Sequence, residues 1–142
     1  MIEIKNLYKS FNGISVLKDI NMEISTNEIV ALQGPSGAGK TTILKSIGLL
    51  DSVNSGSIIF QNKDITQFND VEQCFFRNQE IGFIFQFHNL LPEFSALENI
   101  MMPALISGKS FEKAKSMAIS LIQSLKITNQ KDKKPSQMSG GE

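Results

Sequence analysis

The residues best suited to chemistry in this chain are those at positions 34–42, which read GPSGAGKTT and match the pattern G-x-x-x-x-G-K-[ST]. Glycine adopts positive φ without a steric penalty, so such a loop can curl until successive backbone N–H groups point inward at an anion. The Lys40 ammonium would then reach the β- and γ-phosphates of a nucleotide, and the Thr41 hydroxyl would be a ligand for Mg²⁺. The predicted nucleotide-binding residues of this loop are Gly34, Pro35, Ser36, Gly37, Ala38, Gly39, Lys40, Thr41 and Thr42.

The segments on both sides of the loop fit a phosphate site. Residues 29–32 form an unbroken apolar run, which predicts a strand buried on both faces of a parallel sheet. Over residues 40–50 apolar side chains recur at helical spacing, so a helix should begin at the end of the loop and bind an anion at its N-terminus. A flexible Gly- and Ser-rich loop that matches by chance is the alternative, and the strand–turn–helix context argues against it.

The composition is that of a soluble globular domain. The 142 residues are 41% hydrophobic and 20% charged, and 14 basic side chains balance 14 acidic ones. This balance produces no overall field that would favour nucleic acid or an anionic membrane. Cys74 is the only cysteine, which suits a reducing compartment without disulfides. Because the sequence contains neither a membrane-spanning run nor a signal-peptide pattern, we expect a cytoplasmic protein that reaches a membrane only through a partner.

Hydrophobic periodicity predicts an antiparallel β layer beside a more buried, largely parallel sheet. Alternating apolar residues mark the amphipathic strands of the first layer, and Asn12-Gly13 is a hairpin-type turn. Besides residues 29–32, the expected strands are residues 2–5, 20–25, 56–60 and 81–85.

Three further helices are expected at residues 70–78, 95–108 and 110–125. In the first of them Cys74 is assigned to an apolar face with Val71 and Phe75, whereas Ser95 and Ser110 are predicted N-caps of the other two. An apolar stripe on the last helix is assigned to the core and consists of Phe111, Ala114, Met117, Ala118, Leu121, Ile122 and Leu125.

The phosphate loop alone does not choose among kinases, GTPases and transport ATPases. A GTPase would recognise guanine with an N-K-x-D element, and residues 129–132 read NQKD, with the lysine one place late. Because guanine recognition needs the Asn and Asp in a fixed geometry, this segment is interpreted as a polar loop.

Three other motifs resemble those of ATP-binding subunits of ABC transporters, and they occur along the chain in the same order as in that family. Residues 138–142 read MSGGE and are similar to the L-S-G-G-[QE] signature, Gln86 follows an apolar run as the Q-loop glutamine does, and Phe11 stands in a K-x-F motif like that of the adenine-stacking loop. The resemblance implies an α/β fold of the P-loop NTPase, ABC type, with an N-terminal antiparallel β layer, a parallel core sheet and a helical subdomain. It divides the chain into a β-rich core at residues 1–92 and a signature subdomain at residues 93–142, with the C-terminal part of the fold missing.

Within that family, residues 77–106 are most similar to the ATP-binding subunits of lipoprotein-releasing systems. Val53 departs from the proline that the family usually carries there, in a surface turn. Subunits of macrolide or peptide export and of cell-division complexes share parts of the same segment and remain alternatives. A soluble ABC-type ATPase acting on nucleic acid and a catalytically inactive fragment are the other interpretations, and the neutral charge balance argues against the first of these.

The resemblance also implies ATP and Mg²⁺ as cofactors and assigns a role to each motif. Phe11 would stack on adenine, with Tyr8 as the competing candidate, and Val16 would contact the base beside it. Gln86 would be catalytic and, with Thr41, a metal ligand. The signature residues Ser139, Gly140 and Gly141 would grip the γ-phosphate held by a second ATP-binding subunit, so that ATP closes a head-to-tail dimer. Each residue also has a purely structural alternative. Phe11 and Val16 would then be core residues, Gln86 a polar residue at the end of a strand, and the signature a flexible Gly-Gly segment.

The resemblance finally implies integral-membrane permease subunits as partners, at the cytoplasmic face of the inner membrane, and no nucleic acid. Residues 87–92, which include the only histidine, His88, are expected to receive a cytoplasmic helix of the permease. Family members continue beyond the signature to a Mg²⁺-sensing Asp, a catalytic Glu and a switch histidine. We therefore expect these 142 residues to bind ATP but to hydrolyse it at background rate.

Overall fold

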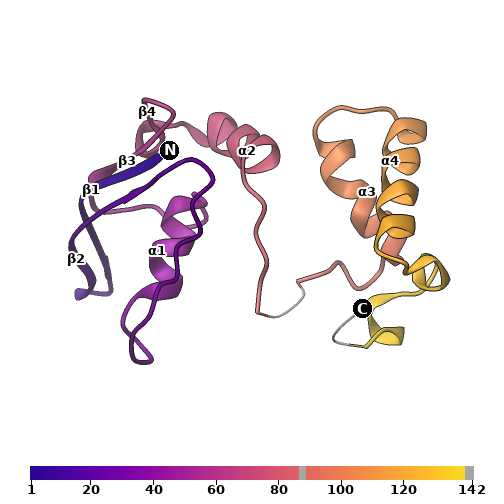
Figure 1. Cartoon of the computed structure of the whole chain (residues 1–142), viewed down its shortest axis with the longest axis horizontal. Helices are drawn as coiled ribbons and strands as arrows, with labels where there is room; N and C mark the ends of the chain where they lie inside the picture. Colours follow the sequence, from indigo (N-terminus) through magenta and orange to yellow (C-terminus); the bar gives the residue numbers. More distant parts are fainter. Residues whose placement is uncertain (87–88, 140–142) are drawn as a thin grey trace. The chain divides into compact units, whose positions relative to one another are not determined.

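The structure is a computed structural model that describes residues 1–86 and 89–139. The chain divides into two compact units, Met1–Arg77 and Asn78–Glu142 (Figure 1). The elements in chain order are β1 (Ile2–Phe11), β2 (Ile14–Ile24), α1 (Lys40–Ile47), β3 (Ser55–Phe60), β4 (Lys63–Asp64), η1 (Ile65–Gln67), α2 (Asp70–Gln79), α3 (Ala96–Ile106), α4 (Phe111–Ser124), η2 (Thr128–Gln130) and η3 (Pro135–Gln137).

The first unit is built on an antiparallel sheet. β1 and β2 form a hairpin closed by Asn12 and Gly13, whose φ angles of 48° and 80° both lie in the left-handed region. Positive φ at both central residues is the geometry that Asn-Gly pairs favour in two-residue hairpins. β3 pairs with the other edge of β1, and β4 extends the sheet to the order β2-β1-β3-β4. The predicted antiparallel layer and its hairpin turn are confirmed.

The core of the first unit joins this sheet to its helices. The buried apolar residues come from all three long strands and from α1, η1 and α2, and are Ile4, Leu7, Leu17, Ile43, Ile58, Ile65 and Phe76. The Phe76 ring makes edge-to-face contacts with Phe60 and Phe68, at centroid distances of 5.1 and 5.9 Å. Each aromatic pair of this kind contributes roughly 0.5–1.5 kcal/mol beyond burial, so Phe76 is the anchor of α2.

The buried face of α2 is therefore not the predicted one. Val71 and Phe75 are 78% and 68% exposed, and the Cys74 thiol is exposed as well. The Arg77 guanidinium donates to the Cys74 sulfur at 3.1 Å and to the Leu49 carbonyl at 2.8 Å. In this short helix, apolar residues occur at helical spacing on more than one face. The contacts of the Phe76 ring with Phe60 and Phe68 therefore decide which face packs inward.

Two predicted strands are absent from the described residues. Residues 29–32 and 81–85 pair with no other strand there, and Ile29 and Ile84 are 97% and 98% exposed. A strand needs a neighbour for its N–H and C=O groups, and an apolar run does not specify which segment supplies that neighbour. The strand predictions at these two places are wrong for this structure, and the parallel layer is not formed by the described residues.

The second unit is a helical pair in which α3 and α4 pack side by side (Figure 1). Met101 of α3 packs against Ala114 and Ala118 of α4, and the partly buried side chains around them are Leu97, Ile100, Ala104 and Leu105. The two small alanines allow the helices to approach closely. No helix in residues 1–86 and 89–139 is long and apolar enough to cross a bilayer.

Only part of the apolar stripe on α4 is buried. Ala114, Ala118 and Ile122 face the core as expected. The other four residues of the stripe were assigned to the core wrongly, because they are exposed on its flank: Phe111, Met117, Leu121 and Leu125. A single helix, α3, covers only one side of α4, so a stripe wider than that contact remains partly uncovered.

Both serine N-caps are confirmed, and the cap of α3 makes a testable contribution at acid pH. The Ser95 N–H and hydroxyl both donate to Glu98 Oε2 at 2.7 Å, and the Glu98 N–H donates back to Ser95 Oγ at 3.3 Å. The hydrogen bond from the Ser95 backbone, followed by that from its hydroxyl, lowers the pKa of Glu98 below its ordinary 4.5. Because the folded state favours the carboxylate, this stabilisation is present above pH 4.5 and is lost as the pH falls through the lowered pKa.

We expect Glu98→Gln to unfold at a lower urea concentration than the wild type at pH 7, and the difference to shrink as the pH falls below 4. Glutamine keeps an acceptor in the capping box and removes the charge, so it isolates the ionic part. Glu112→Gln, in the first turn of α4, serves as the control. An equal difference at both pH values would show that the Glu98 charge does not stabilise the cap.

Candidate functional site

The phosphate loop shares one pocket with residues from the β1–β2 hairpin. This hollow of about 360 Å³ lies in the first unit and is lined by Phe11, Val16, Ser36, Gly37, Ala38, Gly39, Lys40, Thr41 and Thr42. Pockets of roughly 300–1,000 Å³ are the usual size for small-molecule sites. Two segments that are at least twenty residues apart in the sequence therefore face one space.

The hairpin is positioned by its contact with the start of α1. A Cβ atom built on Gly39 would lie 2.8 Å from Leu17 Cδ2 and 3.3 Å from the Val16 carbonyl oxygen. Gly39 also has a φ of 87°, so the loop approaches β2 closely at a residue that only glycine fits. Since Phe11 pairs with Ile14 across the hairpin, fixing Val16 against the loop also fixes the end of β1.

The N-terminus of α1 has the features of an anion site. Its N-cap is Gly39, no side chain caps it, and its first turn contains no acidic residue. The first N–H groups of a helix have no partner within the helix, and the helix dipole adds partial positive charge there. The backbone at this end of α1 can therefore donate to an anion in the pocket.

Lys40 lies folded back over the loop. Its Nζ donates to the carbonyl oxygens of Gly34 and Pro35 at 2.8 and 2.7 Å. These bonds hold the ammonium across the curl of the loop and beside the pocket that Lys40 itself lines. A bound phosphate would compete with the two carbonyls for this ammonium, and a charged acceptor forms the stronger hydrogen bond.

Of the two aromatic candidates for base stacking, the structure places Phe11 in the pocket. Tyr8 is exposed on β1 and does not line the pocket, whereas the Phe11 ring does and is 42% exposed. Val16 lines the same pocket. The aromatic and aliphatic groups expected near a base are thus next to the loop expected to hold phosphates.

The remaining predicted site residues belong to the second unit. Gln86 ends an extended segment in which the Phe83 and Phe85 rings contact each other at 4.5 Å, and its side chain is exposed. Ser139 is also exposed. Gly140 and Gly141 of the signature, together with Phe87 and His88 of the docking segment, lie outside the described residues.

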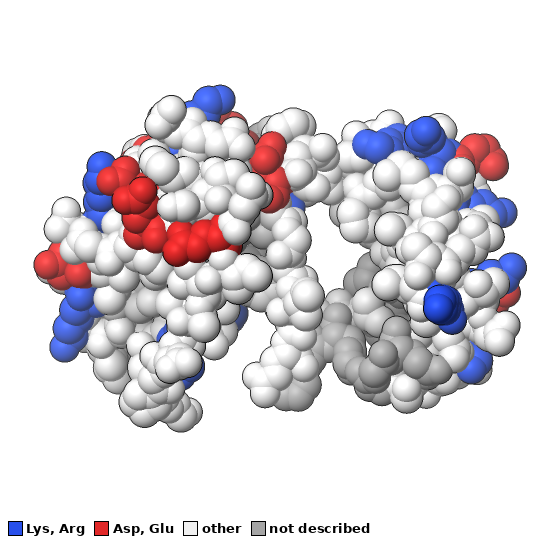
Figure 2. Space-filling view, in the orientation of Figure 1, with Lys and Arg blue, Asp and Glu red and all other residues white. Residues whose placement is uncertain are grey.

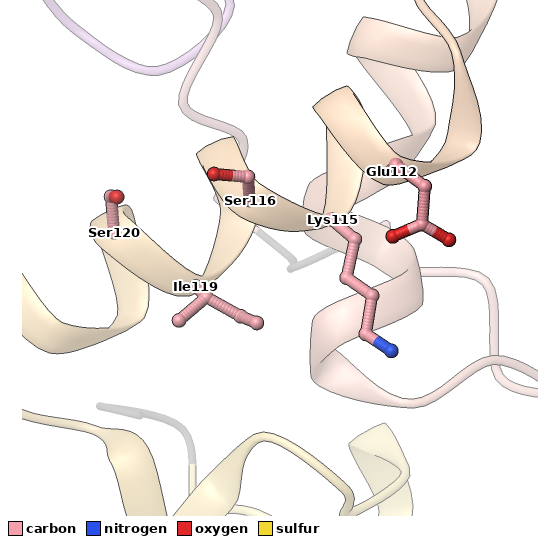
Figure 3. Close-up of a pocket in the computed structure, with 5 residues that line it drawn as sticks. All are labelled: Glu112, Lys115, Ser116, Ile119 and Ser120. Atoms are coloured by element: carbon pink, nitrogen blue, oxygen red, sulfur yellow. The ribbon is translucent and has the colours of Figure 1, made fainter.

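A second hollow, of about 350 Å³, lies along α4 and does not resemble a catalytic site (Figure 3). All five of its lining residues project from that single helix: Glu112, Lys115, Ser116, Ile119 and Ser120. In the part of the chain that the structure describes, no three His, Cys, Asp or Glu residues form a metal cluster. Charged side chains of both signs appear on both units in the view of Figure 2.

Sequence reasoning missed Asn99, which organises the loop before α3. Its Oδ1 accepts from the Leu91 N–H at 2.8 Å, and its Nδ2 donates to the carbonyls of Leu91, Phe94 and Ser95 at 3.0–3.1 Å. One side chain therefore fixes the backbone of Leu91, an exposed residue of the predicted docking segment. The available signal was an amide side chain one turn after the Ser95 cap, a place where it can reach back to the preceding loop.

Comparison with known proteins is consistent with this geometry. A family model described as "ABC transporter" matches residues 17–142. The chain is 49% identical to the lipoprotein-releasing system ATP-binding protein LolD of Porphyromonas gingivalis and 44% identical to that of Bacteroides thetaiotaomicron. Each match covers 100% of this chain and 65% of the relative, so the chain spans just under two thirds of their length.

Solved structures of similar fold are known. A dimeric post-hydrolysis state of the ATP-binding cassette MJ0796, bound to ADP and Pi, matches with a TM-score of 0.90 and 34% identity, over 99% of this chain and 64% of that one. Another dimeric structure of MJ0796, a bacterial ABC transporter cassette, matches with the same TM-score and 35% identity.

Proposed function

Because the chain belongs to the ABC transporter family, whose model matches residues 17–142, we propose that it binds ATP in the pocket of the phosphate loop and serves as the ATP-binding subunit of a transporter. The observation that carries this proposal is the pocket itself, in which the Phe11 ring and the phosphate loop face one space. Titration of the chain with Mg²⁺-ATP tests it directly. Saturable binding is the expected result, and no binding would refute the proposal.

Each part of the pocket has a separate task in the proposed complex. The backbone N–H groups of residues 36–42 donate to the phosphates, and Lys40 exchanges its two loop carbonyls for β- and γ-phosphate oxygens. Phe11 and Val16 hold the base. Phosphoryl transfer requires little covalent chemistry from the protein, so positioning and electrostatic stabilisation of this kind account for most of the catalysis.

The start of α1 offers an oxygen ligand that suits Mg²⁺. The Thr41 hydroxyl lines the pocket next to Lys40, and Mg²⁺ usually takes one or two protein oxygens together with water and substrate phosphates. We assign Thr41 as the protein ligand from this unit, and the family resemblance alone supports the Gln86 amide oxygen as a second ligand. When bound, the ion would neutralise negative charge on the phosphates.

We propose Gln86 as a catalytic residue, because phosphoryl transfer depends on groups that orient the attacking water. Phosphate release from Mg²⁺-ATP measures the rate.

For the longer protein that such relatives represent, we propose that ATP hydrolysis powers lipoprotein release. The support is the 44–49% identity to proteins named for that system. The dimeric cassettes of similar fold support a second ATP-binding subunit. On the family resemblance, we propose that Ser139, Gly140 and Gly141 contact the nucleotide of that second subunit. We place the assembly at the cytoplasmic face of the inner membrane, held there by permease subunits.

The loop held by Asn99 is the proposed permease contact. Leu90 and Leu91 are exposed there, and the backbone of Leu91 is tied at both its N–H and its C=O. We expect Leu91→Asp to weaken co-purification of the full-length subunit with its membrane subunits at least about tenfold, because a charge would be buried in an apolar contact.

Leu121→Asp is the matched control, because Leu121 is a similarly exposed leucine on α4. It should assemble like the wild type, and ATP binding should be unchanged in both variants. Wild-type assembly by Leu91→Asp would remove this loop from the interface.

A further inference from the structure

The Phe11 ring is contacted by a buried cation. Lys9, two residues earlier in β1, is only 9% exposed, and its Nζ lies 4.7 Å from the centroid of the Phe11 ring. Lysine is among the residues least often buried, so a buried lysine needs partners for its charge. The ammonium has two: the face of the Phe11 ring and the carbonyl oxygen of Ser52, to which it donates a hydrogen bond.

Ser52 belongs to the segment that follows α1, and that segment is bound to the end of β1 at several points. The Asn54 N–H donates to the Tyr8 carbonyl at 3.0 Å, and Asn54 Oδ1 accepts from the Ser10 N–H at 2.7 Å. The other end of α1 carries the phosphate loop. Lys9 therefore lies where the strand end that carries Phe11 is joined to the helix that carries the loop.

The ammonium lies over one face of the Phe11 ring, and the ring also lines the pocket. A cation over an aromatic ring is attracted to its negative π face and reduces the electron density that the opposite face presents. A purine, which is rich in π electrons, stacks better on such a face than on an unperturbed phenyl ring. The contact with the cation also restrains the ring, and restraint before binding lowers the entropy lost when a base binds.

We propose that Lys9 is a positioning residue of the nucleotide site, which holds the Phe11 ring from one side so that the purine base stacks on the other. This inference rests on the proposed ATP binding and adds a residue that touches neither base nor phosphate. Its effect should therefore be confined to the part of the affinity that comes from the base.

The test compares two probes, Mg²⁺-ATP and inorganic tripolyphosphate, which lacks base and ribose. Stacking predicts that the wild type binds ATP about 5- to 150-fold more tightly than tripolyphosphate. Lys9→Met keeps the apolar stem and removes the charge. It should reduce this ratio about 2- to 30-fold and leave the tripolyphosphate affinity unchanged.

Two further variants separate positioning from folding. Lys9→Arg retains a cation for the ring and should restore most of the ratio. Lys9→Gln keeps a donor for the Ser52 carbonyl without the charge, so it replaces Lys9→Met if that variant does not fold, with the same expected loss. Lys18→Met, at an exposed lysine of β2, is the matched control and should leave the ratio unchanged.

A double substitution identifies the route of the effect. In a Phe11→Leu background, Lys9→Met should change the ratio no further, because the ring through which it acts is gone. The inference would be overturned if Lys9→Met or Lys9→Gln kept the wild-type ratio of ATP affinity to tripolyphosphate affinity. It would also be overturned if both probes lost affinity equally. Neither result would affect the proposal that the wild type binds ATP. Failure of the wild type to bind ATP would refute the proposed function and the inference with it.

Discussion

Lys40→Ala is expected to weaken Mg²⁺-ATP binding roughly 10- to 150-fold while the chain remains folded. A hydrogen bond to a charged group contributes roughly 1.5–3 kcal/mol, and the variant loses the ammonium that we assign to the β- and γ-phosphates. In the free chain this ammonium holds the carbonyls of Gly34 and Pro35, so part of the loss will come from a looser loop. Isothermal titration with ATP and with tripolyphosphate should show the loss for both ligands, because both carry the phosphates.

The matched control is Lys45→Ala, which removes a lysine from the last turn of the same helix. It should bind both ligands like the wild type. A thermal melt of each variant distinguishes a lost contact from a lost fold. If Lys40→Ala binds ATP with wild-type affinity, the phosphate loop is not the nucleotide site.

Gly56→Ala is expected to destabilise the first unit by roughly 2–5 kcal/mol. Gly56 has a φ of 89° in β3, where an L-residue is strained. A Cβ there would also lie 2.7 Å from Leu7 Cα and from the carbonyl carbon of Asn6, in the irregular stretch where β1 passes β3. Backbone atoms cannot move aside as a side chain can, so strain and overlap add.

Two other glycines separate these contributions. Gly13 has a φ of 80° but open space around it, so Gly13→Ala should cost only the strain, about 1–2 kcal/mol. Gly82 also has open space, and Gly82→Ala should change the free energy of unfolding by less than about 0.5 kcal/mol. Urea unfolding monitored by circular dichroism measures the free energy of unfolding of all three variants. Equal effects of Gly56→Ala and Gly13→Ala would show that β1 yields to the added methyl group.

The family and the fold class follow from the sequence because both depend on local patterns. The residues of a phosphate loop are adjacent in the chain, and their spacing is set by one curl of the backbone. The signature and the Q-loop motif were recognised in the same way, and the family match and the cassettes of similar fold confirm the family and the fold class. Caps and turns are equally local, which is why Ser95, Ser110 and the Asn12-Gly13 turn were predicted correctly.

Pairing between distant segments could not be predicted in this way. Residues 29–32 and 81–85 have strand-like composition, yet a strand forms only where another segment satisfies its backbone, and none does so in the described residues. The same limit applies to helix faces. The stripe on α4 contains seven apolar residues at helical spacing, and the width of its contact with α3 decided that Ala114, Ala118 and Ile122 are buried while its flank is exposed.

The same distinction between local patterns and distant contacts applies to the residues of the candidate site. The phosphate loop, with the Lys40 ammonium and the Thr41 hydroxyl, could be predicted from residue spacing because all of these groups belong to one short motif. Spacing could not predict that Phe11 lines the pocket while Tyr8 does not, or that Lys9 is buried against the Phe11 ring. Those choices depend on the close contact of Gly39 with Val16 and Leu17 and on the tie between β1 and the segment after α1. Contacts between residues so far apart in the chain are set by packing, which residue spacing does not encode.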